Sequence, residues 1–305
     1  MKIEYKHIMQ GHLPILTILL WGMTACSGSD GGFSDRADQE MKLYASSEKL
    51  SGEGTFSDSV FFAKGNESGK YAEIWKGYIK EDGNTILTEP QYYPSDDSRI
   101  YLCGFAPEGK PHGEGQIAYS INGGQDILVT GEQNGCLTDM FWQEGKVFVF
   151  SHLLTQLRFR FQCDTMGKEK GWKLLSLFVE GIQSDVVLSL ADKGLSFSGD
   201  KGTATVFDHT FGGERFPLDA EWVETAGMVM IQPGVTVGLT VVLEDSQGNL
   251  TRFADLPVSF HEADGYPAAG TSYLLSVMLR AGGTYSLSAQ VSEWKKGNNG
   301  TGIID

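Results

Sequence analysis

The chain has 305 residues, and its 39 acidic against 24 basic side chains give a formal net charge of −15 at pH 7. Hydrophobic residues make up 41%, which excludes a disordered chain, and the acidic balance excludes a general basic surface for nucleic acid. Glycine is abundant (39 residues) while proline is scarce (9), which favours many short strands joined by turns.

The N-terminus has the pattern of a targeting signal. After a short basic region, residues 13–20 form an apolar stretch of eight residues, too short for a helix that spans a bilayer of about 30 Å. The following Met-Thr-Ala-Cys at 23–26 resembles the lipobox of bacterial lipoproteins. We therefore expect residues 1–25 to be a lipoprotein signal peptide and the Cys26 thiol to carry a lipid anchor. The alternative is an ordinary secretory signal with an incidental cysteine.

Alternation of apolar and polar residues indicates strands along the rest of the chain. The first candidate strand is 41–45. The clearest later ones are 157–163, 235–243, 273–279 and 285–291. A glycine-containing turn at 280–284 predicts a hairpin between the last two. No amphipathic helix of three turns is evident.

These patterns predict an all-β fold with two antiparallel β-sandwich domains in tandem. A flexible tether at 26–40, rich in Gly, Ser and Asp, precedes them. We place the N-terminal sandwich at 41–145 and the C-terminal sandwich at 146–305. A boundary near 165 is the alternative.

Three cysteines follow Cys26, and an odd number cannot pair completely. We expect Cys103, Cys136 and Cys163 to be buried free thiols.

The sequence predicts no enzyme, no metal site and no cofactor. No His-Glu-x-x-His zinc motif and no Gly-x-Ser-x-Gly elbow occurs. A hydrolase would require carboxylates and histidines to converge in a cleft, as Asp126 and His152 could do. A glycan-binding surface lipoprotein of a nutrient-uptake system is a further alternative. It would require an aromatic platform, which clustering of Trp75, Trp142 and Trp222 on one face would supply.

Four stretches, in order along the chain, resemble those of the fimbrillin-like proteins, the type V pilins of Bacteroidetes. The first contains Tyr93 and Pro94, and the second, Gln-Asp-Ile-Leu at 125–128, contains Asp126. The residues that match in the last two are His152, Leu154, Leu157 and Phe159 in 148–161, and Trp294 before a Gly-rich ending.

The resemblance implies a lipid-anchored subunit of a surface fimbrium that serves adhesion, as stalk, tip or anchor, on the cell outer membrane. A trypsin-like protease would remove the first strand by cutting after Arg36, Lys42 or Lys49. We favour Lys49, because a cut there releases strand 41–45. Another pilus subunit would then donate a strand to the opened groove. The segment after Trp294 is rich in Gly and Asn and makes a poor donor, so 285–294 is the alternative donor. The receptor is not evident from the sequence.

Overall fold

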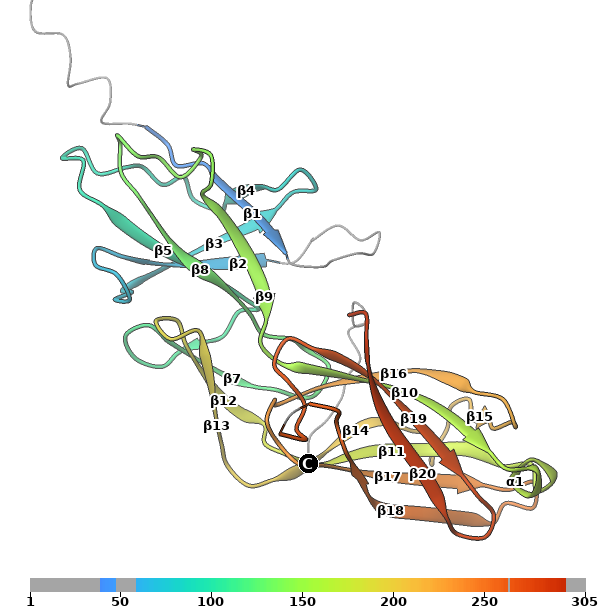
Figure 1. Ribbon diagram of the computed structural model, residues 1–305. Coiled ribbons are helices and arrows are strands. Elements are labelled where there is room, and N and C mark those ends of the chain that lie inside the picture. Colours follow the sequence, from blue (N-terminus) through green and yellow to red (C-terminus); the bar gives the residue numbers. More distant parts are fainter. Residues whose placement is uncertain (1–38, 48–58, 263, 295–305) are drawn as a thin grey trace, which may run out of the picture. The chain divides into compact units, whose positions relative to one another are not determined.

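The computed structural model describes residues 39–47, 59–262 and 264–294. The fold is nearly all β: the described residues form twenty strands and one short helix (Figure 1). Within these ranges no helix has both the length and the apolar character needed to cross a membrane. The predicted signal peptide, Cys26, Arg36 and Lys49 lie outside the described residues.

A closed barrel of seven strands occupies the first part of the described chain. Around the barrel, the strands follow the order β1 (Leu43–Ser47), β4 (Asn84–Leu87), β3 (Glu73–Ile79), β2 (Ser59–Gly65), β5 (Ile100–Ala106), β8 (Leu128–Gly135) and β9 (Val147–His152). Its interior is filled by large side chains, among them Phe62, Phe148 and Phe150, which are fully buried. Closure leaves no free edge where β1 lies between β4 and β9.

A four-stranded sheet joins residues that are distant in sequence. Its order is β13 (Gly194–Ser198), β12 (Asp185–Ser189), β7 (Gln116–Ser120) and β6 (Lys110–Pro111). Residues on both sides of position 145 therefore share one sheet and one apolar cluster, to which Ile117 and Leu188 belong. The described residues all belong to one compact unit, and the domain boundary near 145 stays a prediction.

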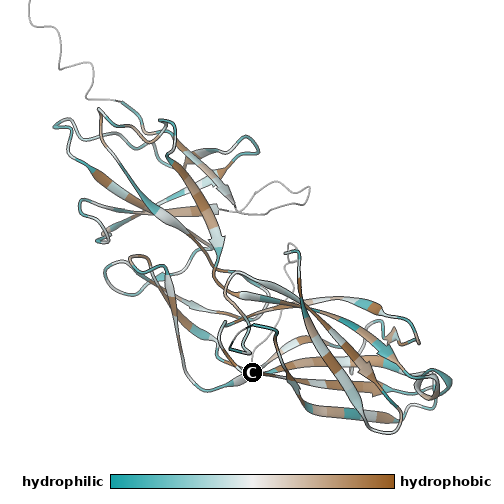
Figure 2. Ribbon diagram, viewed as in Figure 1, coloured by the Kyte–Doolittle hydropathy of each residue, from teal (hydrophilic) through white to brown (hydrophobic). Residues whose placement is uncertain are grey.

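Two further sheets enclose the largest apolar core. The first has the order β16 (Val223–Ile231), β10 (Thr155–Cys163), β19 (Ser272–Leu279) and β20 (Tyr285–Ser292). The second has the order β14 (Gly202–Asp208), β11 (Lys173–Ile182), β17 (Val237–Glu244) and β18 (Leu250–Val258), with β15 (Phe216–Pro217) beside β11. Hydrophobic residues lie along these strands, and hydrophilic residues lie in the turns (Figure 2). Both sheets contribute side chains to the core, as sandwich packing requires.

The helix α1 (Thr165–Glu169) is a single turn after β10. The Asp164 side chain caps it by accepting a hydrogen bond of 2.8 Å from the Gly167 N–H.

The predicted all-β class is confirmed, and so is the hairpin of the last two strands, which pair antiparallel through all eight residues of each. The first predicted strand, 41–45, is displaced to Leu43–Ser47. Two pairings, β1 with β9 and β10 with β19, run parallel. Alternation of residue types does not reveal this, because it reports which side chains are buried and not which strand lies alongside.

Candidate functional site

Strand β1 completes the barrel, and it is the element on which the predicted function depends. On one side it pairs antiparallel with β4, with Leu43 opposite Thr85. On the other side it pairs parallel with β9, from Tyr44 opposite Val147 to Ser47 opposite Phe150. Without β1, the facing edges of β4 and β9 would both lose their partner.

The inward face of this segment is apolar. Met41, Leu43 and Ala45 are 6%, 1% and 2% exposed and belong to the barrel core, whereas Lys42 and Tyr44 point outward. Burial of a side chain such as Leu43 stabilises a fold by about 2 kcal/mol. Removal of β1 would therefore open a groove that has an apolar floor and two unpaired strand edges.

Chain order discriminates among the three candidate processing residues. Lys42 is exposed and directly precedes β1, so a cut after it leaves β1 joined to β2. The same holds for a cut after Arg36, which is earlier in the sequence. Lys49 is the one basic residue in the sequence between the end of β1 and the start of β2. A trypsin-like cut that separates β1 from the barrel must therefore follow Lys49.

Tyr93 supports the barrel from the inside. Its ring is 2% exposed and stacks on Phe141 with centroids 6.0 Å apart, and its Oη accepts a hydrogen bond of 2.7 Å from the Phe141 N–H. Burial raises the pKa of the Tyr93 hydroxyl to about 12. The neighbouring Pro94 begins the turn in which its carbonyl accepts from the Asp97 N–H. The motif around Tyr93 thus has a packing role.

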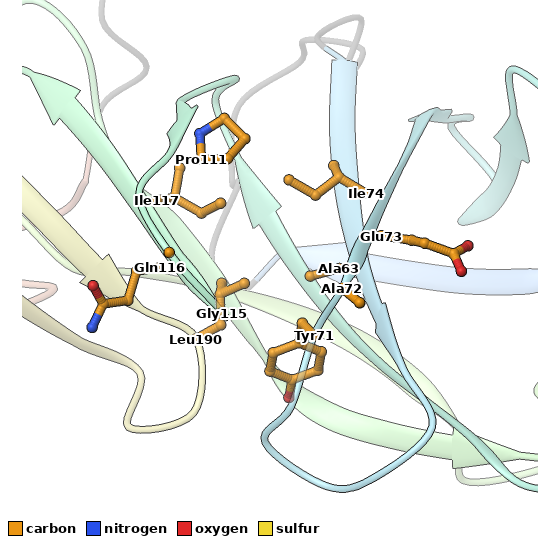
Figure 3. Close-up of a pocket in the computed structure, with 11 residues that line it drawn as sticks. Ala63, Tyr71, Ala72, Glu73, Ile74, Pro111, Gly115, Gln116, Ile117 and Leu190 are labelled. Atoms are coloured by element: carbon orange, nitrogen blue, oxygen red, sulfur yellow. The ribbon is translucent and has the colours of Figure 1, made fainter.

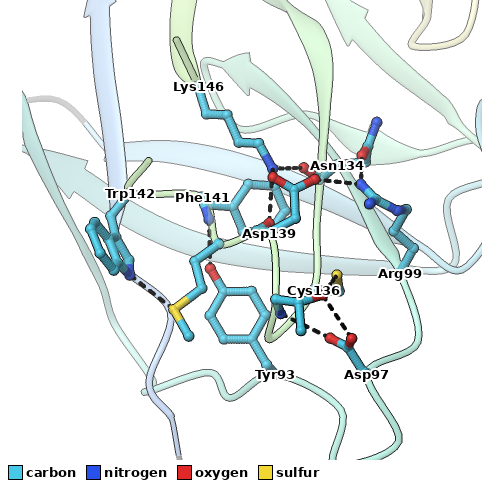
Figure 4. A network of polar contacts seen from close by, with 11 residues as sticks. Tyr93, Asp97, Arg99, Asn134, Cys136, Asp139, Phe141, Trp142 and Lys146 are labelled. Atoms are coloured by element: carbon cyan, nitrogen blue, oxygen red, sulfur yellow. Dashed lines mark hydrogen bonds and ion pairs between the residues drawn. The ribbon is translucent and has the colours of Figure 1, made fainter. Parts of the chain in front are cut away.

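A polar network covers the same end of the barrel (Figure 4). Asp139 pairs with Lys146 and Arg99, each at 2.6 Å, and these cations hold the pKa of its carboxyl below the usual range. Asp97, at a φ of 58°, accepts from the Thr138 N–H and hydroxyl at 3.0 and 2.8 Å. The network joins the loop of Asp97 to the loop of Asp139, and Lys146 and Arg99 compensate the charge of Asp139.

The residues of the 148–161 motif lie where β9 passes into β10. Leu154, Leu157 and Phe159 are fully buried in the apolar clusters. His152, at the end of β9, contacts Asp126 through its Nδ1 and stacks on the Trp294 indole. The fold thus brings together three motif residues that are far apart in sequence.

Among the described residues, this His–Asp pair is buried and has no nucleophile beside it. Both side chains are largely buried, at 9% and 15% exposure, and Trp294 covers the ring. Among the described residues the buried Nε2 of His152 has no hydrogen-bond partner, so no Ser, Thr or Cys lies against it as a nucleophile. Burial raises the pKa of the Asp126 carboxyl, an effect that the bond from His152 opposes.

The three tryptophans proposed as a glycan platform make no ring contact with one another in the described ranges. Trp75 packs on the barrel core, and Trp142 donates its indole N–H to the sulfur of Met140. Trp222 lies under the Arg160 guanidinium, 4.8 Å from the ring centroid.

The remaining cysteines are free and buried, as predicted. Burial raises the pKa of Cys103 to about 12, and it also raises the pKa of Cys163. In both residues burial therefore disfavours the reactive thiolate form. The described residues contain no group of three or more His, Cys, Asp or Glu side chains that could hold a metal ion.

A pocket of about 270 Å³ lies between the start of β3 and the β6–β7 hairpin (Figure 3). Ile74 and Pro111 line its sides, and Ala63, Ile117 and Leu190 contribute apolar surface. Its one charged lining group, the Glu73 carboxylate, is already paired with Lys64 at 3.0 Å.

Comparison with known proteins gives fold similarity alone. No family model matches the chain, and no curated protein matches it. Among solved structures, a candidate cell adhesion protein from Bacteroides uniformis has a TM-score of 0.57 at 14% identity, over 84% of this chain and 99% of that one. A candidate cell adhesion protein from Parabacteroides distasonis has a TM-score of 0.58 at 7% identity, over 85% and 97%. A fimbrial protein from Bacteroides vulgatus has a TM-score of 0.50 at 12% identity, over 84% and 100%.

The chain has the fold of these adhesion and fimbrial proteins. The similarity extends over nearly the full length of each of these structures. It agrees with the resemblance to fimbrillin-like proteins that the four sequence stretches indicate.

Proposed function

We propose that this protein is a subunit of a type V-like surface fimbrium and serves adhesion, with β1 as a strand that is removed for assembly. The observation that carries the proposal is the position of β1, which closes the barrel with an apolar face and is followed by a single basic residue before β2. The fold shared with adhesion and fimbrial proteins supports it. Those neighbours also support a function without catalysis.

The mechanism follows from the two edges that β1 satisfies. A cut after Lys49 leaves β1 held only by its pairing with β4 and β9 and by its buried side chains. A strand from another subunit can then replace it. An extended segment can form hydrogen bonds with the backbone groups of β4 and β9, and apolar side chains at every second position can fill the groove. Assembly would proceed subunit by subunit.

The donor that the fold supports best is the segment from β20 to Trp294. β20 is at the end of its sheet and pairs with β19 alone among the described strands. Most of its side chains are exposed, so its removal uncovers little of the core. The lipid on Cys26 would hold the uncut precursor at the outer membrane, with the fimbrium on the cell surface.

The test uses outer-membrane fractions run on unheated SDS gels before and after trypsin. Donor-strand polymers resist SDS at room temperature, because a whole ladder of hydrogen bonds and the groove contacts must break together. We expect a ladder of bands after cleavage that collapses on boiling, and no ladder from Lys49→Gln. The matched variant Lys42→Gln should still form the ladder. A single band under all conditions would contradict strand exchange.

A further inference from the structure

Trp294 packs against the end of β9. It lies two residues after the end of the C-terminal strand β20. Its indole stacks on the His152 imidazole with ring centroids 3.9 Å apart and an angle of 23° between planes. It also packs against the apolar cluster that contains Ile121, Ile127 and Leu154. The contact therefore links the segment after β20 to β9, a strand of the barrel.

The imidazole that receives Trp294 is held by a buried contact with Asp126. His152 is held through Nδ1 by the Asp126 carboxylate, which also accepts a hydrogen bond of 2.8 Å from the Ile127 N–H. The imidazole is 9% exposed, and its Nε2 has no other partner among the described residues. The ring therefore cannot turn without breaking the buried pair, and its orientation fixes the face on which Trp294 lies.

The strand that precedes Trp294, β20, buries few of its side chains. Among the described strands, β20 is hydrogen-bonded to β19 alone, and only Ala289 of its eight side chains is buried. Val291, two residues after Ala289, is 68% exposed. A strand with a one-sided ladder and little buried surface opens more readily than the central strands of its sheet.

We propose that the stack of Trp294 on His152 is a latch that keeps β20 on its sheet, and that opening this latch frees β20 while the rest of the sandwich stays folded. The proposal rests on the proposed function only for the fate of the freed strand, which would be donation to another subunit. The latch itself is a property of the single chain.

The test is hydrogen exchange of the full chain, followed by mass spectrometry of peptides from β20 and from the central strand β10. Trp294→Ala should speed exchange of the β20 amides about tenfold, because an aromatic stack and its buried area are lost. Exchange in β10 should stay unchanged. Trp294→Phe keeps a stacking ring and should restore most of the protection. Trp142→Ala, which removes a half-exposed tryptophan from a barrel loop, serves as the control and should leave β20 unaffected.

Unchanged β20 exchange in Trp294→Ala would overturn the latch. Equal acceleration in β20 and β10 would overturn it too, since Trp294 would then contribute only to global stability. If β20 exchange accelerates as expected but the cleaved variant forms no SDS-resistant ladder, the donor role fails while the latch stands.

Discussion

At the scale of single residues, the matches to the family pattern are explained by packing and hydrogen bonding. Tyr93 fills the barrel and satisfies a buried backbone N–H, and Leu157 and Phe159 lie in the sandwich core. His152 differs in one respect: its ring is buried, but its Nε2 has no hydrogen-bond partner among the described residues. The face of this ring stacks on Trp294.

The role of Tyr93 can be tested by removal of one atom. Tyr93→Phe keeps the ring stacked on Phe141 but leaves the Phe141 N–H without its acceptor. A buried donor left unsatisfied costs about 1–3 kcal/mol, so the free energy of unfolding in urea should fall by that amount. The neighbouring Tyr92→Phe is the control, because Tyr92 is 51% exposed and its change should have little effect. Equal values for the two variants would contradict the role of the Tyr93 hydroxyl as the acceptor for the Phe141 N–H.

At the scale of elements, the sequence predicts strands well where apolar residues recur at every second position. β19 and β20 lie within one residue of their predicted bounds and form the predicted hairpin. The partner of β1 could not be predicted, because its pairing with β9 closes a barrel across about a hundred residues of sequence. The sequence indicates Asp126 and His152 as a pair that could converge, but the approach of Trp294 to them was hidden for the same reason, since spacing along a chain does not report long-range pairing. The sequence did supply all three residues as separate motifs.

The β2–β3 hairpin depends on a glycine that the sequence alone did not single out. A Cβ on Gly65 would lie 1.8 Å from the backbone carbonyl oxygen of Lys70, so the turn must shift to accept any side chain. Gly65→Ala should lower the free energy of unfolding by about 2 kcal/mol or more. Gly194→Ala is the matched control in another hairpin, where a Cβ meets no atom within 4 Å. Thermal or urea unfolding of both variants decides the matter, and a Gly65 variant as stable as the control would show that the turn adapts.

At the scale of the whole molecule, the two ends of the described chain occupy related positions. β1 closes the barrel beside β9, and Trp294 lies on His152 at the end of the same strand. Under the proposed function, β1 would leave after a single cut and β20 would detach from its pairing with β19. An acceptor groove and a donor segment in one chain are what a self-assembling subunit requires.

If β1 is an exchangeable strand, its exchange can be measured directly. Chain cut by trypsin after Lys49 is mixed with an excess of a fluorescent peptide of residues 39–49, and uptake is followed by anisotropy. We expect the cut chain to take up the peptide and the uncut Lys49→Gln chain not to do so. A peptide with Leu43→Asp should fail, because its charge would face the apolar floor. If the cut chain takes up no more peptide than the uncut one, β1 is not an exchangeable strand.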